Sequence, residues 1–165
     1  MNIQQFFKQG MDREIPELLE GPNGTPSIDL GASGIKKYAT TALGLPEWNF
    51  PRDNIPFNDA SVGVIHAYHF LEHLAGDDAI KLLREAERVL VVGGVMNIVT
   101  PYYNSLIQAQ DITHKSAWNE ESWKTLFHNS YYNPAGEWQF RIHTTFIMAI
   151  VERNLSLFTQ LQKVS

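Results

Sequence analysis

The chain has 165 residues, of which 44% are apolar and 19% charged, as expected for one soluble globular domain with its own core. A formal net charge of −5 argues against binding nucleic acid through phosphates, because that takes a basic surface. The chain has no cysteine, which excludes disulfides, a thiolate nucleophile and a cysteine-ligated zinc.

The N-terminal residues 1–20 lack the continuous apolar run of a signal peptide. No segment reaches the roughly 20 apolar residues that are needed to cross a bilayer. The apolar residues of this region are spaced as in short amphipathic helices, so an N-terminal helical extension is expected over residues 1–26. We expect a single domain over residues 1–165, no membrane partner and a cytoplasmic location.

The first predicted strand is Ser27–Leu30, which follows a cluster of Gly, Pro and Asn and leads into the glycine turn Gly31–Gly34. Residues 39–43 are a candidate second strand. Residues 45–60 are predicted to form a loop with one extended stretch, because they are rich in Pro, Asn and Asp. The next predicted strand, residues 61–67, is apolar enough to be buried.

Residues 70–90 change to the helical spacing of apolar side chains, and Gly76–Asp78 offer an N-cap within this helix. The helix is expected to end at the glycine pair before residue 95. Residues 95–100 then form another apolar strand, which Pro101 stops.

Asn119 is predicted to cap a short helix over residues 120–127. Residues 139–151 and 155–164 are strand-like and are separated by a short segment typical of a hairpin. Strands and helices therefore alternate first, and an antiparallel pair closes the chain. This order predicts an α/β fold, with a mostly parallel sheet and an antiparallel C-terminal hairpin.

Five short motifs occur in collinear order over residues 27–128. They are IDLGASG at 28–34, IPFNDASV at 55–62, HFLEHL at 69–74, RVLVVGG at 88–94 and DITHK at 111–115. Together they resemble the class I S-adenosylmethionine-dependent methyltransferase family, particularly its small members that phage genomes also carry. The resemblance implies a three-layer Rossmann-like sheet, S-adenosylmethionine as cofactor, and methyl transfer to a small-molecule or sugar acceptor.

The resemblance also implies where the cofactor binds. In open parallel sheets, ligands bind beyond the carboxyl ends of the strands, where glycine lets the backbone approach them. The segments that follow the first two strands, up to the IPFNDASV motif, would supply most of the contacts, although the glycine turn and the Asp53-Asn54 pair also fit ordinary turns. The residues expected to bind the cofactor are Asp29, Gly31, Ala32, Ser33, Gly34, Glu47, Asp53 and Asn54.

Several positions depart from the family pattern in the cofactor half. These are Ala32 and Ser33 in the glycine turn, the stretch 34–39, which is too short for the usual first helix, and Gly63 and Val92. Gly44 stands where the resemblance implies a ribose-binding acid, and Glu47 either reaches that ligand or points to solvent. Losing a charged hydrogen bond costs about 1.5–3 kcal/mol, or roughly 10- to 100-fold in affinity. The alternative function is a non-catalytic binding or scaffold protein that kept the fold and lost the cofactor.

Tyr68 and His69 follow the strand at 61–67 and are the candidate catalytic residues. An aromatic face stabilises a sulfonium cation, and His69 has the chemistry of a general base. A structural, hydrogen-bonded histidine is the alternative for His69. Methyl transfer depends mainly on alignment of the reactants, so no dedicated catalytic constellation is required.

His69, Glu72 and His73 also fit H-x-x-E-H, a zinc-protease motif, to which Asp111 and His114 could add ligands. We nevertheless predict no metal. The strand is expected to end near residue 68, which would leave His69 off the helix. The chain is also much shorter than that protease class, and the methyltransferase resemblance already explains the motif.

The loop after the strand at 95–100 is expected to overlook the acceptor, since loops at this edge carry substrate contacts. A loop held by its own hydrogen bonds is the alternative. The candidate substrate-binding residues are Tyr102, Tyr103, Asp111, His114 and Lys115. A small-molecule acceptor is the expected partner and nucleic acid is not. The sequence leaves the oligomeric state open, a homodimer included.

Overall fold

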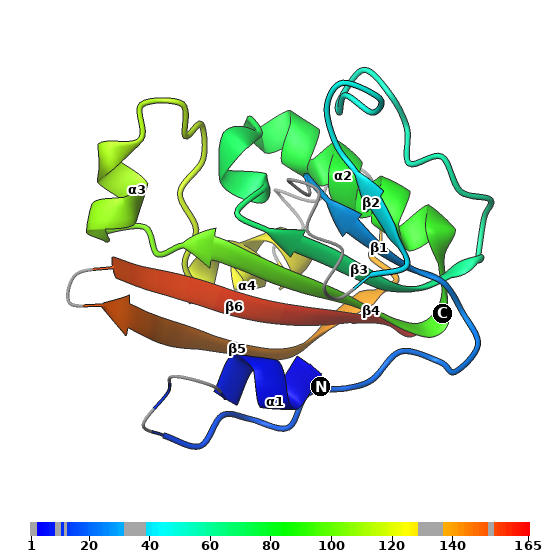
Figure 1. Cartoon of the computed structure of the whole chain (residues 1–165), viewed down its shortest axis with the longest axis horizontal. Helices are drawn as coiled ribbons and strands as arrows, with labels where there is room; N and C mark the ends of the chain where they lie inside the picture. Colours follow the sequence, from blue (N-terminus) through cyan, green and yellow to red (C-terminus); the bar gives the residue numbers. More distant parts are fainter. Residues whose placement is uncertain (1–2, 9–10, 12, 32–38, 129–136, 152–153) are drawn as a thin grey trace.

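The computed structural model describes residues 3–8, 11, 13–31, 39–128, 137–151 and 154–165. Within them, one sheet has the strand order β2-β1-β3-β4-β6-β5 (Figure 1). The strands are β1 Ser27–Leu30, β2 Thr41–Leu43, β3 Val62–Tyr68, β4 Leu90–Pro101, β5 Phe140–Val151 and β6 Asn154–Lys163. Strands β2, β1, β3 and β4 pair in parallel, whereas β6 is antiparallel to both β4 and β5. The predicted mostly parallel sheet with an antiparallel hairpin is confirmed.

The helical elements are α1 Ile3–Lys8, the 3-10 turn η1 Leu71–His73, α2 Gly76–Val89, α3 Leu106–Gln110 and α4 Glu120–His128. No helix in the described part of the chain is both long and apolar enough to span a membrane. In the predicted N-terminal helical extension, α1 is helical, whereas residues 13–26 form neither helix nor strand.

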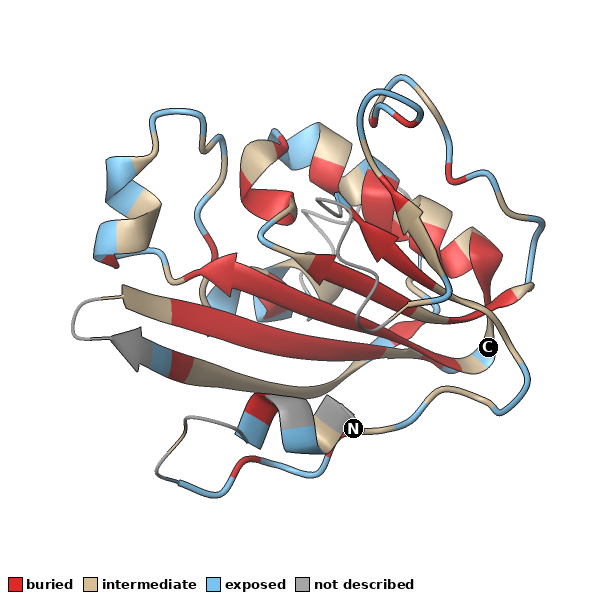
Figure 2. Cartoon of the chain, viewed as in Figure 1, coloured by how far each residue is buried: buried red, intermediate tan, exposed pale blue. Residues whose placement is uncertain are grey.

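Two apolar clusters lie on the two faces of the sheet. The larger contains Leu82 and Leu83 of α2, Trp123 of α4 and Ile98 of β4. The smaller contains Phe7 of α1, together with residues of β4 and β6. Adjacent residues of one strand point to opposite faces, so these clusters place α2 and α4 on one side and α1 on the other. The result is a three-layer arrangement in which the central strands are almost entirely buried (Figure 2).

The predicted helix over residues 70–90 is divided in two. Leu74 and Ala75 adopt extended backbone angles between η1 and α2. The predicted cap at Gly76–Asp78 is wrong, because the N-cap residue is Ala75 and no side-chain hydrogen bond caps α2. The cap predicted for α4 is confirmed, since Asn119 Oδ1 accepts a hydrogen bond from Ser122 N at 2.9 Å.

Strand β4 begins at Leu90, earlier than the predicted residue 95. The glycine pair expected to end the preceding helix therefore lies inside this strand, next to a register shift between Val62 and Val64 of β3. Such an irregularity lets a strand absorb an extra residue and twist. Helix α3 was not predicted. The stretch 34–39, predicted to have lost a helix, falls mostly outside the described residues.

Candidate functional site

A ligand is expected beyond the carboxyl ends of β1 and β3. The chain leaves β1 for β2 on one side and then crosses to β3 on the other, which makes this the switch point of the sheet. Gly31 follows β1 with φ +73°, and its N–H donates to Leu43 O at 2.8 Å. A side chain at such a φ costs about 1–2 kcal/mol, so this turn favours glycine.

Phe70 packs directly on this turn. A Cβ added at Gly31 would stand 2.5 Å from Cδ2 of Phe70. The Phe70 ring stacks on the buried Trp48, with centroids 5.8 Å apart, and Trp48 Nε1 donates to Asn54 O at 3.0 Å. The close approach that Gly31 permits is therefore used by an aromatic ring of the protein itself. Sequence reasoning missed this pair because it depends on the path of the loop after β2.

The predicted cofactor residues divide into distinct environments. Asp29 is only 8% exposed, and burial raises the pKa of its carboxyl to about 6. It lies beside Ala42 of β2 and His66 of β3 in the sheet register. Glu47 is exposed in the turn after β2. The predicted Ala32, Ser33 and Gly34 lie outside the described residues.

Asp53 organises a turn. Its carboxylate accepts hydrogen bonds from Asn49 N at 2.8 Å and from Arg52 Nε and Nη2 at 2.9 and 2.8 Å. The Arg52 hydrogen bond, followed by that of the Asn49 amide, lowers the pKa of Asp53 to about 2. Both carboxylate oxygens are thus engaged, while the neighbouring Asn54 is exposed.

Arg88 connects two of the sequence motifs. Its guanidinium donates to the backbone oxygens of Ile55 and Phe57, both at 2.9 Å, and to Asp59 at 2.8 Å. It also pairs with both oxygens of Glu85 at 2.9 Å. Glu85 Oε2 in turn accepts from Ile55 N at 3.0 Å. The arginine of RVLVVGG therefore holds IPFNDASV against α2, which fixes the segment that follows Asp53.

Tyr68 and His69 leave β3 in different directions. The Tyr68 hydroxyl lies 2.7 Å from His66 Nδ1, and its ring meets the edge of Phe7 on the α1 face. His69 has φ +53° and an exposed side chain, and its Nδ1 lies 3.2 Å from Glu72 Oε1. Strand β3 ends at residue 68 and η1 begins at residue 71, which places His69 outside the helix as expected.

The loop after β4 brings several predicted acceptor residues toward η1. The Tyr102 hydroxyl donates to Glu120 at 3.0 Å, and its ring packs edge-on against the exposed Tyr103. Further along the loop, the His114 ring lies 4.9 Å from that of His73. Sequence reasoning named Asp111, His114 and Lys115 but did not predict their contact with η1. Asp111 Oδ2 lies 3.6 Å from His114 Nε2, and Lys115 N donates to Glu72 O at 2.7 Å.

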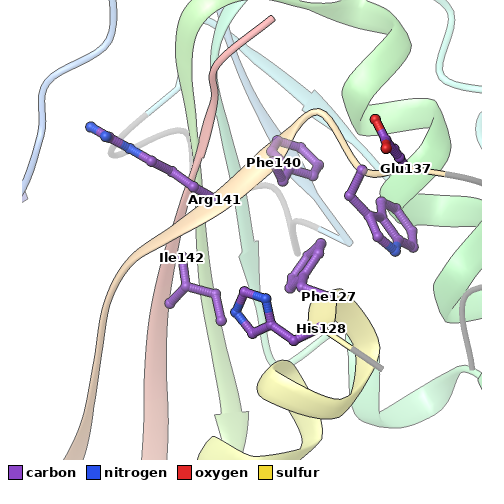
Figure 3. A pocket seen from close by; sticks show the side chains of 7 residues that line it. Phe127, His128, Glu137, Phe140, Arg141 and Ile142 are labelled. Atoms are coloured by element: carbon purple, nitrogen blue, oxygen red, sulfur yellow. The ribbon is translucent and has the colours of Figure 1, made fainter. Parts of the chain in front are cut away.

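An open depression of about 380 Å³ lies between the end of α4 and the start of β5 (Figure 3). Among the residues that the structure describes, none of the predicted site residues lines it. Its wall includes Arg141, which pairs with Gln162 of β6, and Gln162 pairs with Val95 near the start of β4. The depression therefore belongs to the amino-terminal end of the parallel strands, away from the carboxyl ends of β1 and β3. Its lining residues are Phe127, His128, Glu137, Trp138, Phe140, Arg141 and Ile142.

Residues 37–98 match the family model described as "Methyltransferase domain". The match contains the IPFNDASV, HFLEHL and RVLVVGG motifs and begins after the GASG segment at 31–34. No curated protein sequence matches the chain significantly.

Solved methyltransferase structures share the fold. The structure of the Haloferax volcanii Trm112 methyltransferase activator in complex with a methyltransferase aligns with a TM-score of 0.62 and 16% identity, over 86% of this chain and 84% of that chain. Burkholderia thailandensis 1,6-didemethyltoxoflavin-N1-methyltransferase, with S-adenosylhomocysteine bound, aligns with a TM-score of 0.61 and 14% identity. This alignment covers 86% of the present chain and 73% of that enzyme. An S-adenosylmethionine-dependent methyltransferase from Mesorhizobium loti aligns with a TM-score of 0.59 and 14% identity over 87% and 93%.

Proposed function

We propose that this chain is a class I methyltransferase that transfers a methyl group from S-adenosylmethionine to a small-molecule or sugar acceptor, because residues 37–98 match the family model and solved methyltransferases share the fold. The observation that carries the proposal is the turn at Gly31, with φ +73° at the switch point between β1 and β3. When bound, the cofactor supplies an activated methyl group, so the task left to the protein is alignment.

In this proposal, the cofactor binds along the carboxyl ends of β1 and β2. The backbone at Gly31 would lie against it, and the residue types at 32–34 would extend that contact, with Asp29 just before it in β1. Asp53 shapes the 49–53 turn through its three hydrogen bonds and so presents the exposed Asn54. Glu47 is the acidic residue nearest in sequence to Gly44, where the family resemblance implies the ribose-binding acid.

The acceptor would bind between the exit of β3 and the loop after β4. His69 is exposed there, and if its Nδ1 donates to Glu72 Oε1, Nε2 keeps the lone pair that a proton acceptor needs. Tyr68 would position the neighbouring backbone through its hydrogen bond with His66. The exposed loop residues Tyr103 and Lys115 would contact the acceptor. Tyr102, Asp111 and His114, whose polar atoms bond within the protein, would shape the loop around it.

A second function, that of a binding or scaffold module without cofactor, is favoured by one specific observation. The Phe70 ring lies against Gly31, whose backbone is proposed to contact the cofactor. Gly44 at the end of β2 also leaves that strand without the acid implied for the ribose. For S-adenosylmethionine to bind as proposed, Phe70 would have to turn away from this position.

Thermal denaturation and calorimetry with S-adenosylmethionine and S-adenosylhomocysteine distinguish the two functions. A ligand that binds only the native state at 100 times its Kd adds about 2.7 kcal/mol of stability. For a chain of this size, that raises Tm by roughly 5–10 °C. Binding that is lost in Gly31→Val and kept in Gly24→Val would support the methyltransferase. No binding of either ligand up to millimolar concentration would refute it and favour the scaffold.

A further inference from the structure

The turn η1 and the loop after α3 meet beyond the carboxyl end of β3. The N–H groups of Lys115 and Ser116 both donate to Glu72 O, at 2.7 and 3.2 Å. This contact brings together Glu72, His73 and His114, whose potential metal-ligand atoms all lie within 4.8 Å of one another. The three residues come from two segments that are far apart in the sequence.

Glu72 is the most unusual member of this cluster. Its side chain is only 1% exposed, and its Oε1 lies 3.2 Å from His69 Nδ1. Its Oε2 is buried and has no hydrogen-bond partner among the described residues. A buried carboxylate oxygen is rarely left in this state, because neither water nor a donor then offsets its lost hydration. A bound cation would supply the partner that this oxygen lacks.

The tautomer of the neutral His73 ring is set by its neighbours. The Thr113 hydroxyl has one hydrogen, which it donates to Asp111 Oδ1 at 2.7 Å. Towards His73 Nδ1, 3.3 Å away, the same hydroxyl can therefore only accept. Nδ1 of His73 thus carries the hydrogen, and in the neutral ring Nε2 carries the lone pair.

His114 is oriented in the same way by a different partner. Its Nδ1 lies 3.1 Å from Gln108 O, and a carbonyl only accepts, so this nitrogen also carries the hydrogen. The His114 side chain is 7% exposed, which limits its alternative partners. Histidines that bind a metal commonly donate their other N–H to a carbonyl or, through a network, to a carboxylate. Both imidazoles of the cluster are held in that form.

A competing arrangement is a protonated His114 paired with Asp111 Oδ2, 3.6 Å from its Nε2. That pair leaves Glu72 Oε2 without a partner and gives no role to the orientation of His73. Ligands around tetrahedral zinc lie roughly 3.3–3.5 Å apart, given metal–ligand bonds of about 2.0–2.2 Å. The ligand atoms of Glu72, His73 and His114 lie up to 4.8 Å apart. Side-chain movements of about 1 Å would bring them to the spacing around zinc.

We propose that Glu72, His73 and His114 form a zinc site that fastens the loop after α3 to η1. Two imidazoles and one carboxylate suit Zn²⁺ and leave a fourth position for water. The arrangement differs from the H-x-x-E-H protease motif, because His69 orients Glu72 instead of binding the metal. Asp111 and Thr113 act as positioning residues for His73. The inference does not depend on S-adenosylmethionine binding.

The test is zinc binding by the 165-residue chain after treatment with EDTA. The chain has no cysteine and only six histidines, so background binding is small. We expect elemental analysis to find one Zn²⁺ per chain and zinc to raise Tm. With Co²⁺ in place of zinc, the visible absorption spectrum should be that of a four-coordinate ion. His73→Ala and His114→Ala should each lower the affinity by ~100-fold or more, and Thr113→Val by roughly 10- to 100-fold.

His128→Ala is the matched control, because His128 is exposed at the end of α4, outside the cluster. It should bind zinc like the wild type. The proposal is overturned if the wild-type chain takes up no zinc at micromolar concentrations, or if His73→Ala and His114→Ala bind it equally well. Circular dichroism of each variant separates lost ligands from lost folding. Thr113 is exposed, so Thr113→Val tests the site even if a ligand variant fails to fold.

Discussion

Replacing Arg88 with methionine should destabilise the protein strongly, because this one side chain joins α2 to the segment over residues 55–59. Methionine keeps the apolar stem and removes the guanidinium. Five hydrogen bonds of 2.8–2.9 Å are lost, to Glu85, Asp59 and the oxygens of Ile55 and Phe57. Glu85, whose side chain is only 13% exposed, is left with the N–H of Ile55.

The magnitude follows from how exposed each partner is. Asp59 is 81% exposed, so its ion pair contributes little, about 0.5 kcal/mol or less. The pair with Glu85 is mostly shielded from water, and two carbonyls lose their donors, each worth about 1 kcal/mol. The sum for Arg88→Met is about 2–4 kcal/mol. In a chain of this length, that lowers Tm by roughly 5–15 °C.

Urea denaturation followed by circular dichroism measures this loss. Lys124→Met is the matched control, since Lys124 makes an i,i+3 pair with Glu121 on α4 in which both side chains are mainly exposed. It should change stability by less than about 0.5 kcal/mol. If the free energy of unfolding of Arg88→Met lies within about 0.5 kcal/mol of the wild-type value, Arg88 does not hold residues 55–59 against α2, and the reasoning is wrong.

Three further substitutions test other features of the fold. Burial raises the pKa of Asp29 to about 6, so the native chain binds this proton more tightly than the unfolded chain, and stability falls as pH rises between about 4 and 6. Asp29→Asn should therefore raise the free energy of unfolding in urea by roughly 1–3 kcal/mol near pH 7.5 and have no effect near pH 3.5; equal effects at both pH values would contradict this. Gly31→Ala should lower Tm more than Gly24→Ala does, because both glycines have positive φ but only at Gly31 would the added Cβ also meet the Phe70 ring. Equal decreases in Tm would show that the ring moves freely. Lys163→Met should cost about 1–3 kcal/mol, since the buried ammonium bonds two carbonyls near the end of α2 at 2.7 and 2.9 Å, and an unchanged urea midpoint would argue against that role.

Most strands could be predicted from sequence because apolar residues recur along them between turn-forming residues. The predicted strands at 61–67 and 139–151 correspond closely to Val62–Tyr68 and Phe140–Val151. Helix α3 could not be found in this way, since its five residues include none that is buried, and its local feature is a cap by Ser105. The sequence pattern also could not explain Gly63, where any side chain would overlap that of Thr25.

The candidate site was only partly predictable for a related reason. Local motifs indicated which residues follow each strand, and the position of His69 outside the helix is an example. Contacts between segments depend on the path of the loops. Thr113 meets His73 across 40 positions of sequence, and Phe70 meets Gly31 only because the loop after β2 places Trp48 behind it. No periodicity in the sequence encodes such contacts.

The HFLEHL segment lies between the two halves of the proposed site, and its residues divide between them. Phe70 packs on the glycine turn of the cofactor half, whereas Glu72 and His73 face the loop that follows α3. His69 stands at the junction, with its backbone bonded to Val99 of β4 and its side chain to Glu72. Because only Leu71 separates Phe70 from Glu72, a shift of η1 would move the ring on Gly31 together with the carboxylate of the cluster. Ligands at the two places would then affect each other's affinity, and by linkage the effect would be equal in both directions.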